Sequence, residues 1–490
     1  MVRIFSVKLL DNIYLRNIEY HNITVYRLCS KILCKNTFFR NGLRLDIDYA
    51  NRLEYNNSEK SCKFTSNRIG DAKMEIKRNL YLEQLIRKQH NGLIKVITGI
   101  RRCGKSYLLF NIFHTYLIEQ GIRKDHIIEI ALDDRRNRSL RDPDEILRYI
   151  DSNISDNDFY YIIIDEIQLL PEFEDVLNSL LHIRNADIYV TRSNSRFLST
   201  DVITEFRGRG DEIRIYPLVF REFVSVYDGT EDEAWDDYFV YGGLPLVLSM
   251  KTTADKASYL SSLFQKVYIS DIVERNRIKN IEEMDELVDI LASAIGSLTN
   301  HSKLAKTMKS VKNKSITDKT LKKYIDYLTD AFLVSKAKRF DIKGKKYIGA
   351  PAKYYFEDIG LRNARLGFRQ LEETHLMENI IYNELRVRGY LVDVGVVDWV
   401  ETDKEGKRKR KQVEVDFIAT RGSEKYYIQS AFALGSTEKV EQEQRSLLHI
   451  SDSFKKIIIV ADNIKVRRNE KGIMTMGLRT FLLNENSLNI

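Results

Sequence analysis

The sequence predicts an α/β protein with a parallel sheet that carries helices on both faces. Between residues 93 and 217, five short apolar segments alternate with segments of helical periodicity, which is the pattern of strand–helix–strand units. The chain has 490 residues, about three times the length of an ordinary domain. Hydrophobic residues make up 43% and charged residues 30%, so we expect a globular protein of several domains.

The elements follow in a regular order. The first strand is predicted at 93–98 and ends in a glycine-containing loop, and the helix that follows, over 106–120, should end at Gly121. The Asp-Pro pair at 142–143 starts the next helix. The other predicted strands cover 126–132, 160–166, 187–191 and 211–217.

Composition and periodicity divide the chain into five parts. Beyond the parallel sheet the chain reads as helical, then as two short helices followed by a β-hairpin, which is typical of a winged helix, and last as a helix with four strands. We therefore expect an N-terminal extension at 1–73, the α/β domain at 74–240, a helical lid or linker at 241–298, a winged-helix-like domain at 299–369, and a smaller α/β domain at 370–490.

The first 73 residues show no lasting periodicity. Met74 begins a sequence that looks like the natural opening of the α/β domain, so two hypotheses fit the extension: a poorly ordered segment, or an upstream read-through that is not native. His21, Cys29, Cys34 and Cys62 could form a Cys₃His zinc site, but they lack a C-x₂-C pair, and scattered thiols are the favoured interpretation.

Composition also restricts the cell compartment and the partner. No apolar run approaches the roughly 20 residues that cross a bilayer, no signal peptide is evident, and four cysteines do not make a disulfide framework. These features predict a cytoplasmic protein without a membrane partner. The net charge of +8 permits a nucleic-acid partner without requiring one.

A phosphate-binding motif follows the first predicted strand. Gly99, Ile100, Arg101, Arg102, Cys103, Gly104, Lys105 and Ser106 match G-x-x-x-x-G-K-[ST], and Tyr107 continues into the helix. Such glycines let backbone N–H groups point at a phosphate, where the N-terminus of the helix adds partial positive charge. Lys105 can reach the β- and γ-phosphates and the Ser106 hydroxyl can bind Mg²⁺. The motif therefore predicts ATP and Mg²⁺ as ligands; the alternative is a plain glycine turn with an exposed lysine.

Two acids at the end of the third strand complete the predicted site. Asp165 is placed to bind the metal, and Glu166 is suited to polarising a water against the γ-phosphate. A buried apolar strand rarely ends in adjacent acids without a use, because the desolvation of charge is costly. The alternative role for Asp165 is a helix N-cap.

The motifs GIRRCGKS, YYIIIDEIQLLPEFEDVLNSL, TRSNSRFLS, RGRGDEIRIYPLVFREF, YGGLP and YYFEDIGLRNARLG resemble those of prokaryotic AAA-type P-loop ATPases with a C-terminal domain related to restriction endonucleases. The resemblance covers about Met74 to Ala461 and implies a P-loop NTPase fold. It implies that Asn194 orients the attacking water, on a strand between the loop strand and the acid strand. It also implies that Arg209 contacts the γ-phosphate of its own or of a neighbouring subunit in a homo-oligomer; the alternative is a solvated surface arginine. The sequence departs from the pattern at Arg192, which stands where the family has glycine and could crowd the site or supply another cation.

Basic residues gather in the predicted winged helix and in the last domain. They are Lys319, Lys322 and Lys323 on the expected recognition helix, Lys336, Lys338, Arg339, Lys343, Lys345 and Lys346 in the hairpin, and the run 407–411. These side chains could neutralise DNA phosphates or form solvated faces. The sequence leaves DNA or a protein as the partner of 299–490.

The last domain resembles the PD-(D/E)xK nuclease core in layout. Glu378 on its first helix and Asp416 on a strand suit metal binding, with Glu414 on the same strand face. The expected E-x-K reads Gln429-Ser430-Ala431, which lacks the carboxylate and the ammonium. We therefore expect a nuclease-like remnant used for recognition or scaffolding. The overall prediction is Mg²⁺-dependent ATP hydrolysis that changes how the C-terminal domains hold a partner; the alternatives are a slow ATP-binding scaffold and an ATP-gated nuclease.

Overall fold

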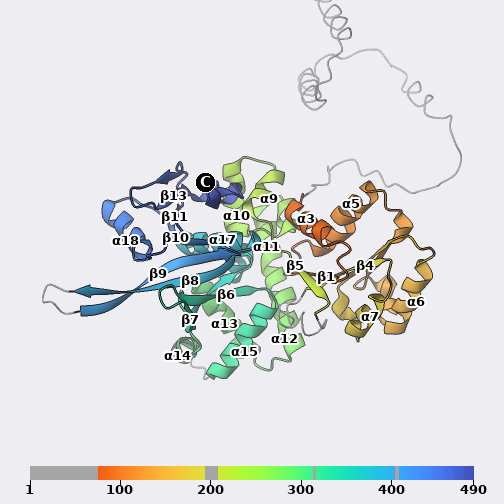
Figure 1. The fold of residues 1–490 in the computed structure, drawn as a ribbon. Coiled ribbons are helices and arrows are strands. Elements are labelled where there is room, and N and C mark those ends of the chain that lie inside the picture. The colour runs from red at the N-terminus through yellow and green to blue at the C-terminus, as the bar shows by residue number, and fades with distance from the viewer. Residues whose placement is uncertain (1–75, 194–207, 313–315, 403–407) are drawn as a thin grey trace, which may run out of the picture. The chain divides into compact units, whose positions relative to one another are not determined.

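The computed structural model describes residues 76–193, 208–312, 316–402 and 408–490, which belong to one compact unit, Lys73–Ile490 (Figure 1). The expectations for residues 1–73, including the cysteine cluster, lie outside the described residues, as does Asn194. None of the helices in the described ranges has the length and apolar composition needed to cross a bilayer.

The first sheet has five strands that all run parallel. They are β1 (Ile94–Thr98), β2 (Ile127–Ala131), β3 (Tyr160–Asp165), β4 (Ala186–Thr191) and β5 (Gly210–Arg214), in the order β2-β3-β4-β1-β5. The predicted parallel sheet is confirmed, and β4 lies between the loop strand and the acid strand. The carboxyl ends of all five strands meet at one edge, where open α/β sheets bind ligands.

Helices cover both faces of this sheet. Val96 packs in one core with residues of α6 (Pro143–Asn153) and α7 (Phe173–Leu180). Its neighbour Ile97 points to the opposite core, as alternation along a strand requires. That second core contains α3 (Asn79–Lys88) and the helix after the loop, which runs as α4 (Lys105–Tyr107), the π-helical turn η2 (Leu108–Phe113) and α5 (His114–Glu119).

The region after the first sheet is helical, as predicted. It contains α9 (Phe220–Val226), α10 (Glu231–Tyr241), η6 (Pro245–Ser249), α11 (Thr253–Leu263), η7 (Phe264–Ile269), α12 (Ser270–Asn276) and α13 (Ile281–Ser293). Two further helices, α14 (His301–Lys312) and α15 (Asp318–Asp330), precede the second sheet.

The second sheet has eight strands. They are β6 (Val334–Asp341), β7 (Lys346–Phe356), β8 (Leu391–Thr402), β9 (Arg408–Arg421), β10 (Glu424–Ala431), β11 (Lys455–Val460), β12 (Arg467–Arg468) and β13 (Met474–Gly477), in the order β12-β13-β11-β10-β9-β8-β6-β7. The helices α16 (Ile359–Arg365), α17 (Glu373–Val387), α18 (Thr437–Leu448) and α19 (Leu478–Leu483) lie between or after these strands in the chain. The helix and the four main strands predicted for 370–490 are present.

The boundary predicted at 369/370 does not separate two sheets. The hairpin β6–β7 forms as expected, but β6 pairs in parallel with β8 through residues 339–341 and 394–396. A two-stranded hairpin alone leaves an unpaired edge and is marginally stable, and pairing with β8 removes that edge. The predicted wing is therefore part of the C-terminal sheet. Arg339 is buried and donates to Gln412 Oε1 at 2.7 Å, so this side chain has neither of the two roles considered for it, a phosphate contact or a solvated face.

Candidate nucleotide-binding site

The loop after β1 needs glycine at two positions. Gly99 has φ +140° and a Cβ there would lie 2.1 Å from the Ile215 carbonyl oxygen, so no other residue fits. Gly104 has φ +100° and stands directly before the helix that begins at Lys105. The loop backbone thus leads directly into the N-terminus of a helix that continues to Glu119. Backbone N–H groups at a helix N-terminus bind anions such as phosphate.

Side chains of the loop divide into those that face the core and those that face the site. Ile100 and Cys103 are buried, and the Cys103 Sγ lies 3.7 Å from the Ile215 carbonyl oxygen, so these two residues can offer a ligand only their backbone. Lys105 is 4% exposed, and its Nζ donates to the carbonyl oxygens of Gly99 at 2.9 Å and Ile100 at 3.0 Å. The ammonium therefore lies against the loop that it is predicted to serve.

The structure brings the two predicted metal-binding residues together. The Ser106 hydroxyl donates to Asp165 Oδ2 at 2.8 Å, and the Thr191 hydroxyl at the end of β4 donates to Asp165 Oδ1. Burial raises the pKa of the Asp165 carboxyl, and the two hydroxyl donors partly offset that effect. Hydroxyl and carboxylate oxygens are the ligands that Mg²⁺ prefers.

Glu166 lies beside this pair in a special backbone conformation. Its φ is +54°, in the left-handed region that few non-glycine residues adopt, and its N–H donates to Thr191 Oγ1 at 2.9 Å. The carboxylate accepts from Gln168 Nε2 and from the Ser193 hydroxyl. These donors fix the orientation of the Glu166 side chain.

A polar hollow of about 490 Å³ joins the loop to the acids. It is lined by Arg101, Arg102, Gly104, Lys105, Ser106, Tyr107, Asp133, Glu166, Gln168, Leu169 and Ser193. The sequence analysis missed Asp133, Gln168, Leu169, Thr191 and Ser193. A signal existed for Asp133, which comes two residues after β2, while Glu166 comes directly after β3, because carboxyl ends of parallel strands share one edge.

A second, largely apolar hollow of about 390 Å³ adjoins the first. The two share Arg102, Gly104 and Tyr107, and the walls of the second are completed by residues before β1 and after β5, including Ile76, Leu218, Pro245 and Leu246. A ligand with a charged and an apolar end would fit across both.

The helical region contacts the loop directly. The Tyr268 hydroxyl donates to the Arg101 carbonyl oxygen at 2.7 Å, and the Arg101 guanidinium lies 3.5 Å from Asp271. The conformation of the loop is thus linked to η7 and α12.

Two predictions made from the resemblance have different outcomes. Arg209 precedes β5 at the amino end of the sheet, where its carbonyl oxygen accepts from the Ile94 N–H and its guanidinium donates to Asn178 Oδ1. The loop leaves the carboxyl end of β1, about 13 Å from the amino end where Arg209 lies. The prediction that Arg209 contacts the γ-phosphate of its own subunit is therefore wrong. Arg192 is buried with its guanidinium 5.0 Å from the Phe173 ring centroid, and it is not among the side chains that line the polar hollow.

The predicted nuclease-like carboxylates meet around an ammonium. Lys353 on β7 places its Nζ 2.8 Å from Glu378, 2.8 Å from Glu414 and 3.5 Å from Asp416. Burial raises the pKa of Glu378 to about 7. Gln429 is turned elsewhere and accepts from Ser446 Oγ at 3.3 Å. Lys353, which the sequence analysis missed, therefore stands at the position between the carboxylates that a metal ion would need.

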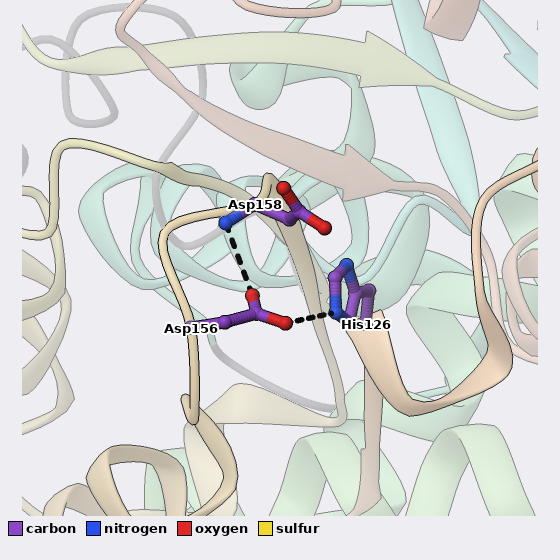
Figure 2. Close-up of side chains that lie close together, drawn as sticks. All are labelled: His126, Asp156 and Asp158. Atoms are coloured by element: carbon purple, nitrogen blue, oxygen red, sulfur yellow. Dashed lines mark hydrogen bonds and ion pairs between the residues drawn. The ribbon is translucent and has the colours of Figure 1, made fainter.

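Within the described ranges, one set of His and carboxylate side chains is close enough to share a metal ion: His126, Asp156 and Asp158 (Figure 2). His126 Nε2 lies 3.2 Å from Asp156 Oδ2. The Arg123 guanidinium donates to Asp156 Oδ2 at 2.9 Å and also contacts His126 Nε2. Because Arg123 already supplies the positive charge, the cluster is an ion-pair network at the amino edge of the sheet.

The match of one family model agrees with this geometry. Residues 91–224 match the model of an AAA domain, and residues 232–372 match a domain of unknown function, DUF8612. An uncharacterised protein of Haemophilus influenzae is 36% identical over 394 residues, which cover 79% of this chain and 94% of that protein. An uncharacterised protein of Methanocaldococcus jannaschii is 28% identical over 387 residues, which cover 76% of this chain and 81% of that protein.

Among solved structures, a Walker-type ATPase of Pyrococcus abyssi is similar at 17% identity and a TM-score of 0.43, and the match covers 60% of this chain and 96% of that one. The chain therefore belongs to the family of the H. influenzae protein, with an AAA-type P-loop ATPase domain followed by the domain of unknown function.

Proposed function

We propose that this protein binds ATP with Mg²⁺, hydrolyses it, and uses the cycle to change contacts between its helical region and its C-terminal sheet. The observation that carries the proposal is the bond between Ser106 and Asp165 at the rim of the polar hollow, beside Lys105 and Glu166. An ammonium, a hydroxyl and two carboxylates, the groups that a triphosphate with Mg²⁺ needs, thus converge from the start of α4 and the end of β3.

Phosphates would lie against the loop. Lys105 now donates to two neutral carbonyl oxygens, and a triphosphate offers charged acceptors, which form stronger bonds. Ser106 and Asp165 would hold Mg²⁺, which neutralises charge on the phosphates. The apolar hollow beside Tyr107 and Pro245 would receive the base, since a purine is flat and largely apolar.

Glu166 would accept the proton of the attacking water. Its carboxylate lines the hollow and is oriented by Gln168 and Ser193, as a general base requires. Asn194 would orient the water from the segment that follows Ser193.

Two variants separate binding from turnover. Lys105→Ala should weaken ATP binding about tenfold or more, because a charge-assisted contact is lost. Glu166→Gln should keep ATP binding and lower turnover by about a hundredfold or more, because the base is lost. Binding is measured with labelled ATP and turnover by phosphate release, with Lys124→Ala and Glu172→Gln as matched exposed controls.

Unchanged ATP binding in Lys105→Ala would overturn the proposal. Equal, negligible turnover in wild type and Glu166→Gln would instead favour the slow ATP-binding scaffold.

Coupling would run through hydrogen bonds to Glu357 and Asp358, the two residues that follow β7. Gly243, next to the residues that wall the apolar hollow, donates its N–H to Asp358 Oδ2 at 2.7 Å, and Asp358 also accepts from Leu361 N at 2.9 Å at the start of α16. Arg214 at the end of β5 donates to Glu357 at 2.6 Å. A change at Pro245 or Leu246 on nucleotide binding would therefore reach the C-terminal sheet.

For the C-terminal domain we propose partner binding rather than cleavage. Lys353 occupies the centre of the three carboxylates, so metal-dependent cleavage there would first require the ammonium to leave. A plasmid-nicking assay with Mg²⁺ or Mn²⁺ tests this, and cleavage that Asp416→Ala abolishes would establish the nuclease instead.

A further inference from the structure

A basic hollow lies at the far edge of the C-terminal sheet, where β11 and β13 begin and β12 ends. It measures about 250 Å³, and its lining includes Ser453, Phe454, Lys455, Lys456, Arg468 and Lys471. The hollow combines the first residues of one strand, the last residue of another and a tight turn between strands.

All four charged residues that line this hollow are basic. No carboxylate lines it, and within the part of the chain that the structure describes none of its four cations forms an ion pair with an acid. Two other cations of the same domain are paired, Arg421 with Glu424 and Lys439 with Glu443, both at 2.9 Å. Unpaired charge in a concave site raises the local potential for anions.

Two of the four cations donate to backbone carbonyl oxygens. Lys455 Nζ donates to the Leu488 carbonyl oxygen at 3.1 Å and Lys456 Nζ to the Asp452 carbonyl oxygen at 2.8 Å, which leaves further donors on each ammonium. The turn that carries Lys471 is fixed by Asn469, whose Oδ1 accepts from the N–H groups of Lys471 at 3.1 Å and Ile473 at 2.9 Å. The Lys455 and Lys456 ammonium groups, which are held in place, would lose little entropy on binding an anion.

An exposed aromatic ring lies in the same hollow. Phe454 is 39% exposed, and Lys425 Nζ lies 4.9 Å from its ring centroid. Cations that follow a phosphate backbone beside a ring that stacks on bases are the two components of single-strand binding sites.

We propose that this hollow binds single-stranded nucleic acid, with phosphates on Lys455, Lys456, Arg468 and Lys471 and a base against Phe454. This binding does not depend on the nucleotide site, with which the hollow shares no lining residue. Any coupling of this binding to ATP hydrolysis rests on the proposed function. The hollow also differs from the surfaces that the sequence suggested, which were the basic face of α15, the hairpin and the run 407–411.

The test is binding of a fluorescent oligothymidylate to the full chain, followed by anisotropy across a salt series. The double variant Arg468→Gln/Lys471→Gln should weaken binding about tenfold or more at low salt and reduce the slope of log K against log salt by about 1.4, because two phosphate contacts are lost. The matched control Lys319→Gln/Lys322→Gln on α15 changes the charge equally and should bind as wild type. Phe454→Ala should weaken binding about fivefold or more without changing the salt slope, because stacking is lost.

Three results would overturn the proposal: no binding by wild type, equal binding by the double variant, or equal loss in the α15 control. Competition gives a further decision. If inorganic polyphosphate or duplex DNA displaced the probe as well as unlabelled oligothymidylate does, the site would be a general anion site and the assignment would fail. ATP retention is measured on the same variants and should be unchanged, so a failure of nucleotide binding is recognised separately.

Discussion

The buried carboxylate of Asp358 connects the segment after α10 to the start of α16. It is 2% exposed, and the close approach of Gly242 lets it reach the Gly243 N–H, since a Cβ on Gly242 would lie 2.4 Å from Asp358 Oδ1. Burial raises the pKa of Asp358 to about 6. The Asp358 carboxylate thus joins the YGGLP and FEDIGLRNARLG motifs, because it accepts from Gly243 in the first and from Leu361 in the second.

The raised pKa of Asp358 makes stability depend on pH. The folded state holds the Asp358 proton more tightly than the unfolded state, so this contribution is present below about pH 4 and is lost as pH rises through about 6. We expect the difference in unfolding free energy between wild type and Asp358→Asn to fall by about 2 kcal/mol between pH 4 and pH 7. Denaturant melts at several pH values measure it, and parallel curves for the two proteins would refute the assignment.

Another buried residue pair shows what sequence periodicity does not reveal. Lys95 on β1 is 0% exposed and forms an ion pair with Asp187 on β4, while Tyr189 donates to the same carboxylate at 2.8 Å. Burial lowers the pKa of Lys95. The pair joins adjacent central strands below the nucleotide site.

At the scale of elements, Lys353 joins β7 to α17 and β9. Its contacts with Glu378, Glu414 and Asp416 connect the hairpin to the strands and helix of the C-terminal sheet, and Tyr355 also donates to Glu378 at 2.5 Å. This arrangement explains why the hairpin belongs to that sheet.

Removal of the Lys353 ammonium should leave buried carboxylates without a cation. We expect Lys353→Met to lower the unfolding free energy by about 3–5 kcal/mol, with Lys346→Met, an exposed change on the same strand, as the control. If Glu378→Gln, added to Lys353→Met, restores part of the lost unfolding free energy, the ion-pair cluster is supported. If Lys353→Met alone is as stable as wild type, the cluster is contradicted. Denaturant unfolding measures all three.

For the whole molecule, the position of Arg209 decides how it could act. It is exposed at the amino edge of the first sheet, so it can contact a γ-phosphate only in another subunit. If the chain assembles in that way, Arg209→Ala and Lys105→Ala proteins should each be inactive alone, and their mixture should recover ATP turnover, because one intact site would form between subunits. Phosphate release from the mixture measures this; full activity of Arg209→Ala alone would show that the arginine is a surface residue.

Local sequence determined the first sheet, the loop after β1 and the acid pair after β3. Strand and helix periods and the φ that Gly99 and Gly104 must adopt are short-range properties, so the predicted strands agree with the observed ones to within a few residues. The sequence also placed Ser106 and Asp165 at one edge, because parallel strands end together.

The tertiary structure alone decided the pairing of β6 with β8, the position of Lys353 among three carboxylates, and the basic hollow beside Phe454. Each depends on contacts between residues far apart in the chain, and strand order and side-chain neighbours across a sheet leave no periodic trace in the sequence. The same reason explains Arg209: the family resemblance implied a contact with the γ-phosphate, and the direction of β5 places Arg209 at the opposite edge of the sheet.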